Sequence, residues 1–214
     1  MDSFWLRFPK ILRQLRRVDA LKFTNDSGDY PDHERLMISG RLVFVEGGGY
    51  RNYPLARKYR DFYRRTLSEA KPPVDANSVL ASEKINLAVH IRRGDYASWL
   101  GGKYFYSDDV YLSAIEQMLT LIGTKARIVV FTNDPFPDRA PYQAAFGDVA
   151  FPGSDAHVDH YLMSLCDYII GPPSTFSMWA SYIGKAKYPS YLLRKRDNRQ
   201  RLVRDLRRLM PPLF

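Results

Sequence analysis

The chain has 214 residues, of which 45% are hydrophobic and 26% are charged, with a formal net charge of +9. This composition is typical of a globular α/β protein and argues against a disordered chain or a fibrous repeat. The lone cysteine, Cys166, excludes an internal disulfide framework and a cysteine-based zinc site, and it fits a reducing compartment. No apolar run approaches the roughly 20 residues that a membrane span needs.

The excess positive charge lies at the two ends of the sequence. Residues 1–20 hold five basic and two acidic residues, and residues 194–208 hold eight basic and two acidic residues. The remaining segment, 21–193, holds 19 basic and 19 acidic residues and is neutral. Neither a basic groove that tracks a phosphate backbone nor nucleic acid as a partner is therefore expected.

Both ends are predicted to form basic amphipathic helices. In residues 1–20 the apolar residues recur at three- and four-residue spacing: Phe4, Trp5, Phe8, Ile11, Leu12, Leu15 and Val18. Such helices either pack on the domain with their basic faces in solvent or lie on an anionic membrane surface, through residues 1–20 and 194–208. Because residues 1–20 lack the unbroken apolar centre of a secretory signal, the chain is expected in the cytoplasm, free or peripheral to the inner face of the membrane.

Between these ends, strand-like runs alternate with helical ones. In chain order we predict a strand over 41–46, a helix over 55–67, a strand over 85–91, a helix over 108–122, strands over 127–132 and 149–151, a helix over 158–166, a strand over 168–170, a helix over 174–184 and a strand over 190–193. This alternation predicts an α/β domain over 21–214 with a parallel sheet and right-handed crossovers.

Polar residues follow three of the predicted strands, at the edge where a parallel sheet binds its ligands. Arg92, Arg93 and Asp95 follow the predicted strand over 85–91, and Asp134 follows the one over 127–132. Ser174 and Thr175, with Phe176 beside them, follow the one over 168–170. A guanidinium fork and a helix N-terminus both bind phosphate oxygens, so together they predict a pyrophosphate clamp. One arginine is expected to face the ligand and the other to pair with a carboxylate, for which Asp95 lies nearest. An ordinary helix cap over 174–176 is the alternative.

Residues 90–96, HIRRGDY, resemble the H-x-R-R-G-D-Y signature of family-11 α-1,2-fucosyltransferases. Two further stretches follow in the family's order: residues 131–134 are similar to F-[ST]-[ND]-D, and residues 159–180 resemble a longer segment that ends in S-[ST]-F-S-x-W-x-A. The resemblance implies a Rossmann-like parallel sheet over 21–214, the GDP-sugar-binding half of a GT-B glycosyltransferase. It also implies an enzyme that transfers fucose from GDP-fucose to a glycan hydroxyl with inversion, with no cofactor and no obligatory metal.

The resemblance further implies a role for each matched residue. Arg92 would contact the β-phosphate of the donor and support departure of GDP, with Arg93 in a supporting role. His90 and Asp159 would lie near the guanine and ribose. Ser174, Thr175 and Phe176 would cradle the pyrophosphate, while Asp95 and Asp134 are further supporting candidates.

The sequence departs from the family at its start, because the G-G-L-G-N-Q-like segment that begins the family's first domain is absent. Two alternatives to an active fucosyltransferase are therefore kept: a GDP-sugar-binding module that needs a partner domain, and a basic protein that binds a membrane or nucleic acid surface. No general base is assigned. Five aromatic residues lie close together after the arginines, and they are expected either to stack on sugars or to pack at the rim: Tyr96, Trp99, Tyr104, Phe105 and Tyr106.

Overall fold

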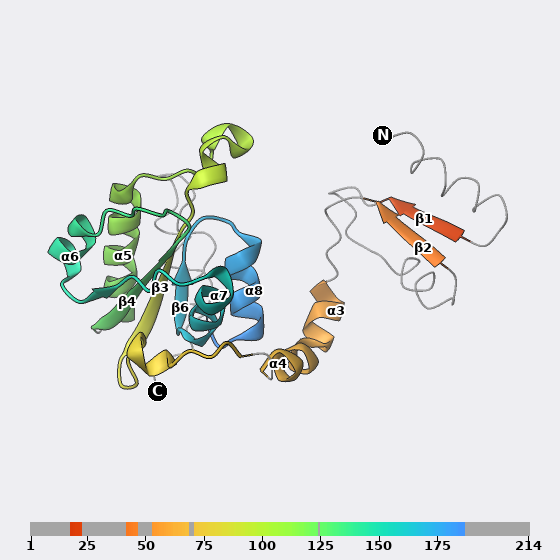
Figure 1. Cartoon of the computed structure of the whole chain (residues 1–214), viewed down its shortest axis with the longest axis horizontal. Helices are drawn as coiled ribbons and strands as arrows, with labels where there is room; N and C mark the ends of the chain where they lie inside the picture. The colour runs from red at the N-terminus through yellow and green to blue at the C-terminus, as the bar shows by residue number, and fades with distance from the viewer. Residues whose placement is uncertain (1–17, 23–41, 47–52, 69–70, 124, 187–214) are drawn as a thin grey trace. The chain divides into compact units, whose positions relative to one another are not determined.

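The computed structural model describes residues 18–22, 42–46, 53–68, 71–123 and 125–186 of the chain. These residues belong to two units, one within Met1–Tyr59 and the other within Arg60–Phe214 (Figure 1). The division lies inside the segment predicted as one domain, 21–214.

The first unit contains two paired strands and a short helix. Strand β1 (Val18–Lys22) runs parallel to β2 (Leu42–Glu46), with Val18 opposite Leu42, and α3 (Tyr53–Lys58) follows. Strand β2 confirms the strand predicted over 41–46. The prediction of a helix through residue 20 is wrong for residues 18–20, because the backbone of β1 pairs with β2, from Val18 opposite Leu42 to Lys22 opposite Glu46. The rest of that predicted helix lies outside the described residues.

The second unit is built on an all-parallel sheet. Its strands are β3 (Ile85–Ile91), β4 (Ala126–Thr132), β5 (Val149–Ala150) and β6 (Tyr168–Ile170), in the order β5-β4-β3-β6 (Figure 1). The register places His90 opposite Phe131 and Val89 opposite Ile170. This sheet confirms the α/β class and the parallel arrangement. The strand predicted over 190–193 and the basic helix over 194–208 lie outside the described residues, so membrane binding through the two ends stays a prediction.

Helices connect these strands. They are α4 (Arg60–Ser68), α5 (Asp108–Ile122), α6 (Ala140–Phe146), α7 (Ala156–Leu165) and α8 (Thr175–Ile183). Helix α5 has the predicted bounds, whereas the helix predicted over 55–67 is divided into α3 and α4. Helix α6 was not predicted, because its seven residues are too few to show a helical period. Two short 3-10 turns, Gly94–Ala97 and Trp99–Gly102, follow β3.

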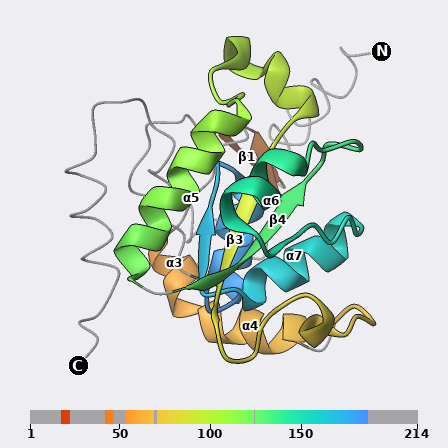
Figure 2. The same ribbon diagram turned by 90° about the vertical axis from the view of Figure 1, so that its left-hand side faces the viewer.

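Successive side chains of β3 point to opposite faces of the sheet. The odd-numbered residues from Leu87 to Ile91 pack in one core with α5 and α6, and Ala88 packs in the other core with α7 and α8. The sheet thus lies between two helical layers (Figures 1 and 2). Continued past the end of β3, the same alternation directs Arg92 toward the α8 layer and Arg93 toward the α5 layer.

The end of α8 is held closely against α7 and α4. A Cβ atom on Gly184, the residue after α8, would lie 1.9 Å from the backbone oxygen of Ser164. From α4, Arg60 donates from Nε to the Tyr182 oxygen at 2.7 Å, and Arg64 donates from Nε to the Ile183 oxygen at 3.1 Å. These donors satisfy carbonyls that a helix end leaves free. Helix α8 is therefore positioned from its last turn.

Candidate active site

The end of β3 and the beginning of α8 are in direct contact. His90 is buried, with Nδ1 2.6 Å from Oγ of Ser177 and its ring 5.4 Å from the ring of Phe176. The backbones approach so closely that a Cβ on Gly171 would lie 2.7 Å from the His90 oxygen. The structure thereby brings together His90 and Phe176, which are 86 positions apart in the sequence.

The environment of His90 keeps its imidazole neutral. Burial, together with the positive charge of Arg92, lowers the pKa of His90 from 6.5 to about 4. At neutral pH the ring therefore joins β3 to α8 as a hydrogen-bonding group and not as a cation.

The pKa of His90 predicts how stability changes with pH. The folded chain binds fewer protons at this ring than the unfolded chain does between pH 6.5 and about pH 4. The free energy of unfolding therefore carries its full contribution from neutral His90 above pH 6.5. It falls as the pH decreases through this window, by an amount on the order of 3 kcal/mol. We expect His90→Asn to flatten the loss of unfolding free energy across the window, measured by urea denaturation at each pH. An unchanged slope in His90→Asn would contradict the assignment.

The two arginines after β3 have different environments, and Arg93 is enclosed by the α5 layer. Its side chain is only 14% exposed, and its Nη2 lies 2.7 Å from Oδ1 of Asp108. Nη1 donates to the Tyr106 oxygen, and the guanidinium lies over the Tyr111 ring, 5.5 Å from the centroid. The expectation that Asp95 would be the partner of the structural arginine is wrong, because strand alternation turns Arg93 toward α5 and its first-turn carboxylate.

Asp108 joins Arg93 to a second side chain, the hydroxyl of Tyr142, which donates to Oδ1 at 2.6 Å. Asp108→Ala removes both interactions and leaves the mostly buried Arg93 unpaired, so we expect a loss of about 2 kcal/mol in the free energy of unfolding. Asp109→Ala is the matched control, because Asp109 is exposed in the same first turn of α5. Urea denaturation measures both variants, and equal losses would show that the network contributes nothing beyond the helix dipole.

Arg92 lies on the other side, at the open edge of the sheet. Its side chain is 34% exposed, and its Nη2 is 2.9 Å from Oδ1 of Asp95, which is itself 58% exposed. The Arg92 guanidinium also lies 5.6 Å from the centroid of the Tyr96 ring. Tyr96 in turn donates from its hydroxyl to the Pro173 oxygen at 2.8 Å, next to the cap of α8. Tyr96 thus connects Arg92 to the start of α8, a link that sequence reasoning missed.

Helix α8 begins with the predicted cap. Oγ of Ser174 accepts from the Phe176 amide at 3.2 Å, and Thr175, the first helical residue, is exposed. An N-terminus of this kind carries partial positive charge and backbone donors. Phe176 also contacts α7, where the ring of His160 meets the Phe176 ring edge-on with centroids 4.9 Å apart.

Residues 47–200 match glycosyl transferase family 11, and this stretch includes every site residue predicted from the sequence. The chain belongs to this family. A comparison with curated proteins finds no significant match.

Membership of family 11, the α-1,2-fucosyltransferase family, makes the chain a glycosyltransferase and confirms the resemblance carried by HIRRGDY. The two arginines of that motif have different surroundings: Arg92 faces the open rim and Arg93 is enclosed. Within the described ranges no group of three or more His, Cys, Asp or Glu side chains is arranged to hold a metal ion. In those same ranges, no helix has the length and apolar character to cross a membrane.

Two acidic residues of the family-11 motifs have hydrogen-bond partners that lie close to them in the sequence. Asp159 on α7 is 8% exposed and accepts from the Ser154 hydroxyl, and burial raises the pKa of its carboxyl. Asp134 shapes its own loop, since its Oδ1 accepts from the Phe136 amide at 2.9 Å. Its neighbour Asn133 makes the contact with the segment after β3 instead, accepting from the Arg93 amide at 2.7 Å.

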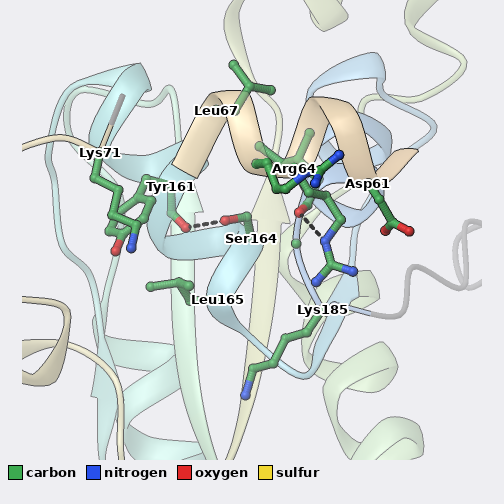
Figure 3. Close-up of a pocket in the computed structure, with 11 residues that line it drawn as sticks. Asp61, Arg64, Leu67, Lys71, Tyr161, Ser164, Leu165 and Lys185 are labelled. Carbon is green, nitrogen blue, oxygen red and sulfur yellow. Dashed lines mark hydrogen bonds between the residues drawn. The ribbon is translucent and has the colours of Figure 1, made fainter. Parts of the chain in front are cut away.

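A second hollow, a groove of about 780 Å³, lies beside α4 and the last residues of α7 (Figure 3). It is lined by the last residues of α7 and α8 and by α4, including Arg64, Lys71, Ser164 and Lys185 (Figure 3). In a parallel α/β unit the helix ends lie at the amino edge of the sheet, so the length of β3, roughly 20 Å, separates this groove from Arg92. Lys185 is also paired with Asp167 at 2.9 Å. The groove is therefore a separate feature from the rim.

Proposed function

We propose that this chain transfers fucose from GDP-fucose to a hydroxyl of a glycan acceptor, with inversion at the anomeric carbon and without an obligatory metal. The observation that carries the proposal is the placement of Arg92, a one-third exposed guanidinium connected through Tyr96 to the N-terminal end of α8. A cation and a helix N-terminus at one rim suit a ligand with two adjacent phosphates.

In the proposed reaction these groups act mainly when the bond between fucose and the β-phosphate breaks. The acceptor oxygen forms a bond to the anomeric carbon of fucose, the bond from that carbon to the β-phosphate oxygen breaks, and the acceptor hydroxyl releases its proton. Negative charge then grows on the departing GDP. Fixed donors placed where that charge develops stabilise the transition state more than the ground state. In the proposal Arg92 supplies this stabilisation, supported by Ser174, Thr175 and Phe176.

The remaining predicted residues fit supporting roles. Asp95 holds Arg92 in position at 2.9 Å and is exposed enough for a phosphate to replace it. His90 is neutral and fixes β3 to α8, beside the position proposed for the nucleoside. Asp159 remains proposed for the guanine and ribose end, from α7.

The test is nucleotide binding followed by turnover. Calorimetry with GDP, GDP-fucose and UDP should show binding of the first two and weaker binding of UDP. Release of GDP is then measured with and without a mixed library of glycan acceptors, and repeated with EDTA. No binding of GDP at millimolar concentration would overturn the proposal. Binding without acceptor-dependent release would favour the module that needs a partner domain.

A further inference from the structure

An aromatic ladder begins beside Arg92 and leads away from the proposed phosphate site. Its rungs are Tyr96, Trp99 and Tyr104: the Tyr96 and Trp99 rings stack with centroids 4.9 Å apart and planes at 29°, and the Trp99 and Tyr104 rings lie 5.5 Å apart at 34°. Tyr96 is buried, whereas Trp99 is 44% exposed. Figures 1 and 2 show the lime-coloured turns that carry the ladder extending beyond the end of β3.

The turn that presents Trp99 has a costly backbone conformation. Leu100 has φ +50°, and Gly101 and Gly102 follow at +66° and +73°. Leu100 is the one residue other than glycine with positive φ among the described residues. The turn is held by hydrogen bonds from the Gly101 amide to the Ser98 oxygen at 3.1 Å and from the Phe105 amide to the Gly102 oxygen at 3.0 Å. Left-handed leucine is disfavoured, and such strain gathers at ligand-binding sites.

The turn also leaves apolar surface in water. Leu100 is 62% exposed and Phe105 43%, in addition to the indole of Trp99. A monomeric protein rarely exposes neighbouring large apolar groups without a ligand or partner to cover them. Charged groups stand at both ends of the ladder, since Arg92 lies by Tyr96 and Lys103, which can bond to sugar hydroxyls, lies 5.4 Å from the Tyr104 ring centroid. Aromatic rings with a few polar groups are typical of a small-molecule subsite.

The position of each ring relative to Arg92 indicates which sugar that ring would contact. Fucose is bonded directly to the β-phosphate proposed for Arg92, so it must lie within one sugar ring of that guanidinium. The rung at this distance is Tyr96, 5.6 Å from Arg92, and it is buried. The exposed rung, Trp99, is the next ring of the ladder, stacked on Tyr96 with centroids 4.9 Å apart, and the sugar that receives fucose would lie against it. We propose that Trp99 is the stacking platform for a pyranose ring of the acceptor glycan, an inference that rests on the proposed function of the same site.

Kinetics of Trp99→Ala test this subsite. We expect the acceptor KM to rise about tenfold or more, while the dissociation constant for GDP and the slow hydrolysis of GDP-fucose without acceptor stay within about twofold. Trp99→Phe should recover most of the loss. Trp179→Ala is the matched control, because Trp179 is 43% exposed and stacks on Tyr182 at 5.1 Å, but on α8. It should keep the acceptor KM within about twofold.

A second measurement needs no turnover. Intrinsic fluorescence is titrated with the mixed glycan library, and quenching in the wild-type protein that is lost in Trp99→Phe but kept in Trp179→Phe supports the platform. An unchanged acceptor KM in Trp99→Ala, or a GDP affinity lost to the same degree, would overturn it while leaving fucose transfer intact. If the wild type binds no GDP, the proposed function fails, and quenching through Trp99 alone then decides whether the glycan platform stands.

Discussion

Arg92→Ala is expected to lower kcat/KM for fucose transfer by about 100- to 1,000-fold, the range seen when one fixed donor to a developing anion is removed. Arg92 reaches the open rim, while Arg93 from the same motif is enclosed against α5. Removal of Arg92 therefore takes away the accessible guanidinium of the motif. Fucose transfer is measured by GDP release, and the affinity for GDP by calorimetry.

Two further variants separate charge from geometry at this position. Arg92→Lys keeps the positive charge but loses the bidentate fork, so we expect an intermediate loss. Asp95→Ala removes the carboxylate that pairs with Arg92, and because this pair is exposed it should change stability by less than about 1 kcal/mol. If Arg92→Ala binds GDP like the wild type, the pyrophosphate does not bind at this rim, and the basic groove of Figure 3 becomes the next site to test.

The largest expected effect on stability comes from Gly184→Ala. The new Cβ would lie 1.9 Å from the Ser164 backbone oxygen, so α7 and α8 must move apart. Overpacking of this kind costs typically 1–3 kcal/mol, and because the contact is with backbone we expect about 3 kcal/mol. For a chain of this size that corresponds to a fall in Tm of roughly 6–12 °C, measured by thermal unfolding.

The control for this variant is Gly123→Ala at the end of α5. Gly123 has φ +71° and nothing within 4 Å of an added Cβ, so its substitution carries only the strain of the left-handed conformation, about 1 kcal/mol. Equal losses in the two variants would show that α7 and α8 separate without cost. Movement of α8 would also shift its start at Ser174, so we expect Gly184→Ala to weaken GDP binding as well.

Local sequence patterns were sufficient for most of the fold. The buried apolar run of β3 and the acidic start of α5 predicted both elements with the observed bounds, 85–91 and 108–122. The predicted strand over 168–170 also has the observed bounds. Sequence patterns did not predict α6, because its seven residues are too few to show a helical period. They also did not predict that Val18 is in a strand, because that depends on its pairing with β2.

By itself, the sequence determined the family, the α/β class and the rim on which the candidate residues lie, because these depend on residue types and on hydrophobic periods read along the chain. The tertiary structure alone decided which partners these residues have. Arg93 pairs with Asp108, which also accepts from Tyr142, and Tyr96 donates to Pro173, through contacts between segments up to 77 residues apart. The physical reason is that the pairing of β3 with β4 and β6 sets which loops meet, and no local pattern records that register. Strand alternation was the one signal that could have separated Arg92 from Arg93 beforehand, since adjacent residues leave a strand toward opposite faces.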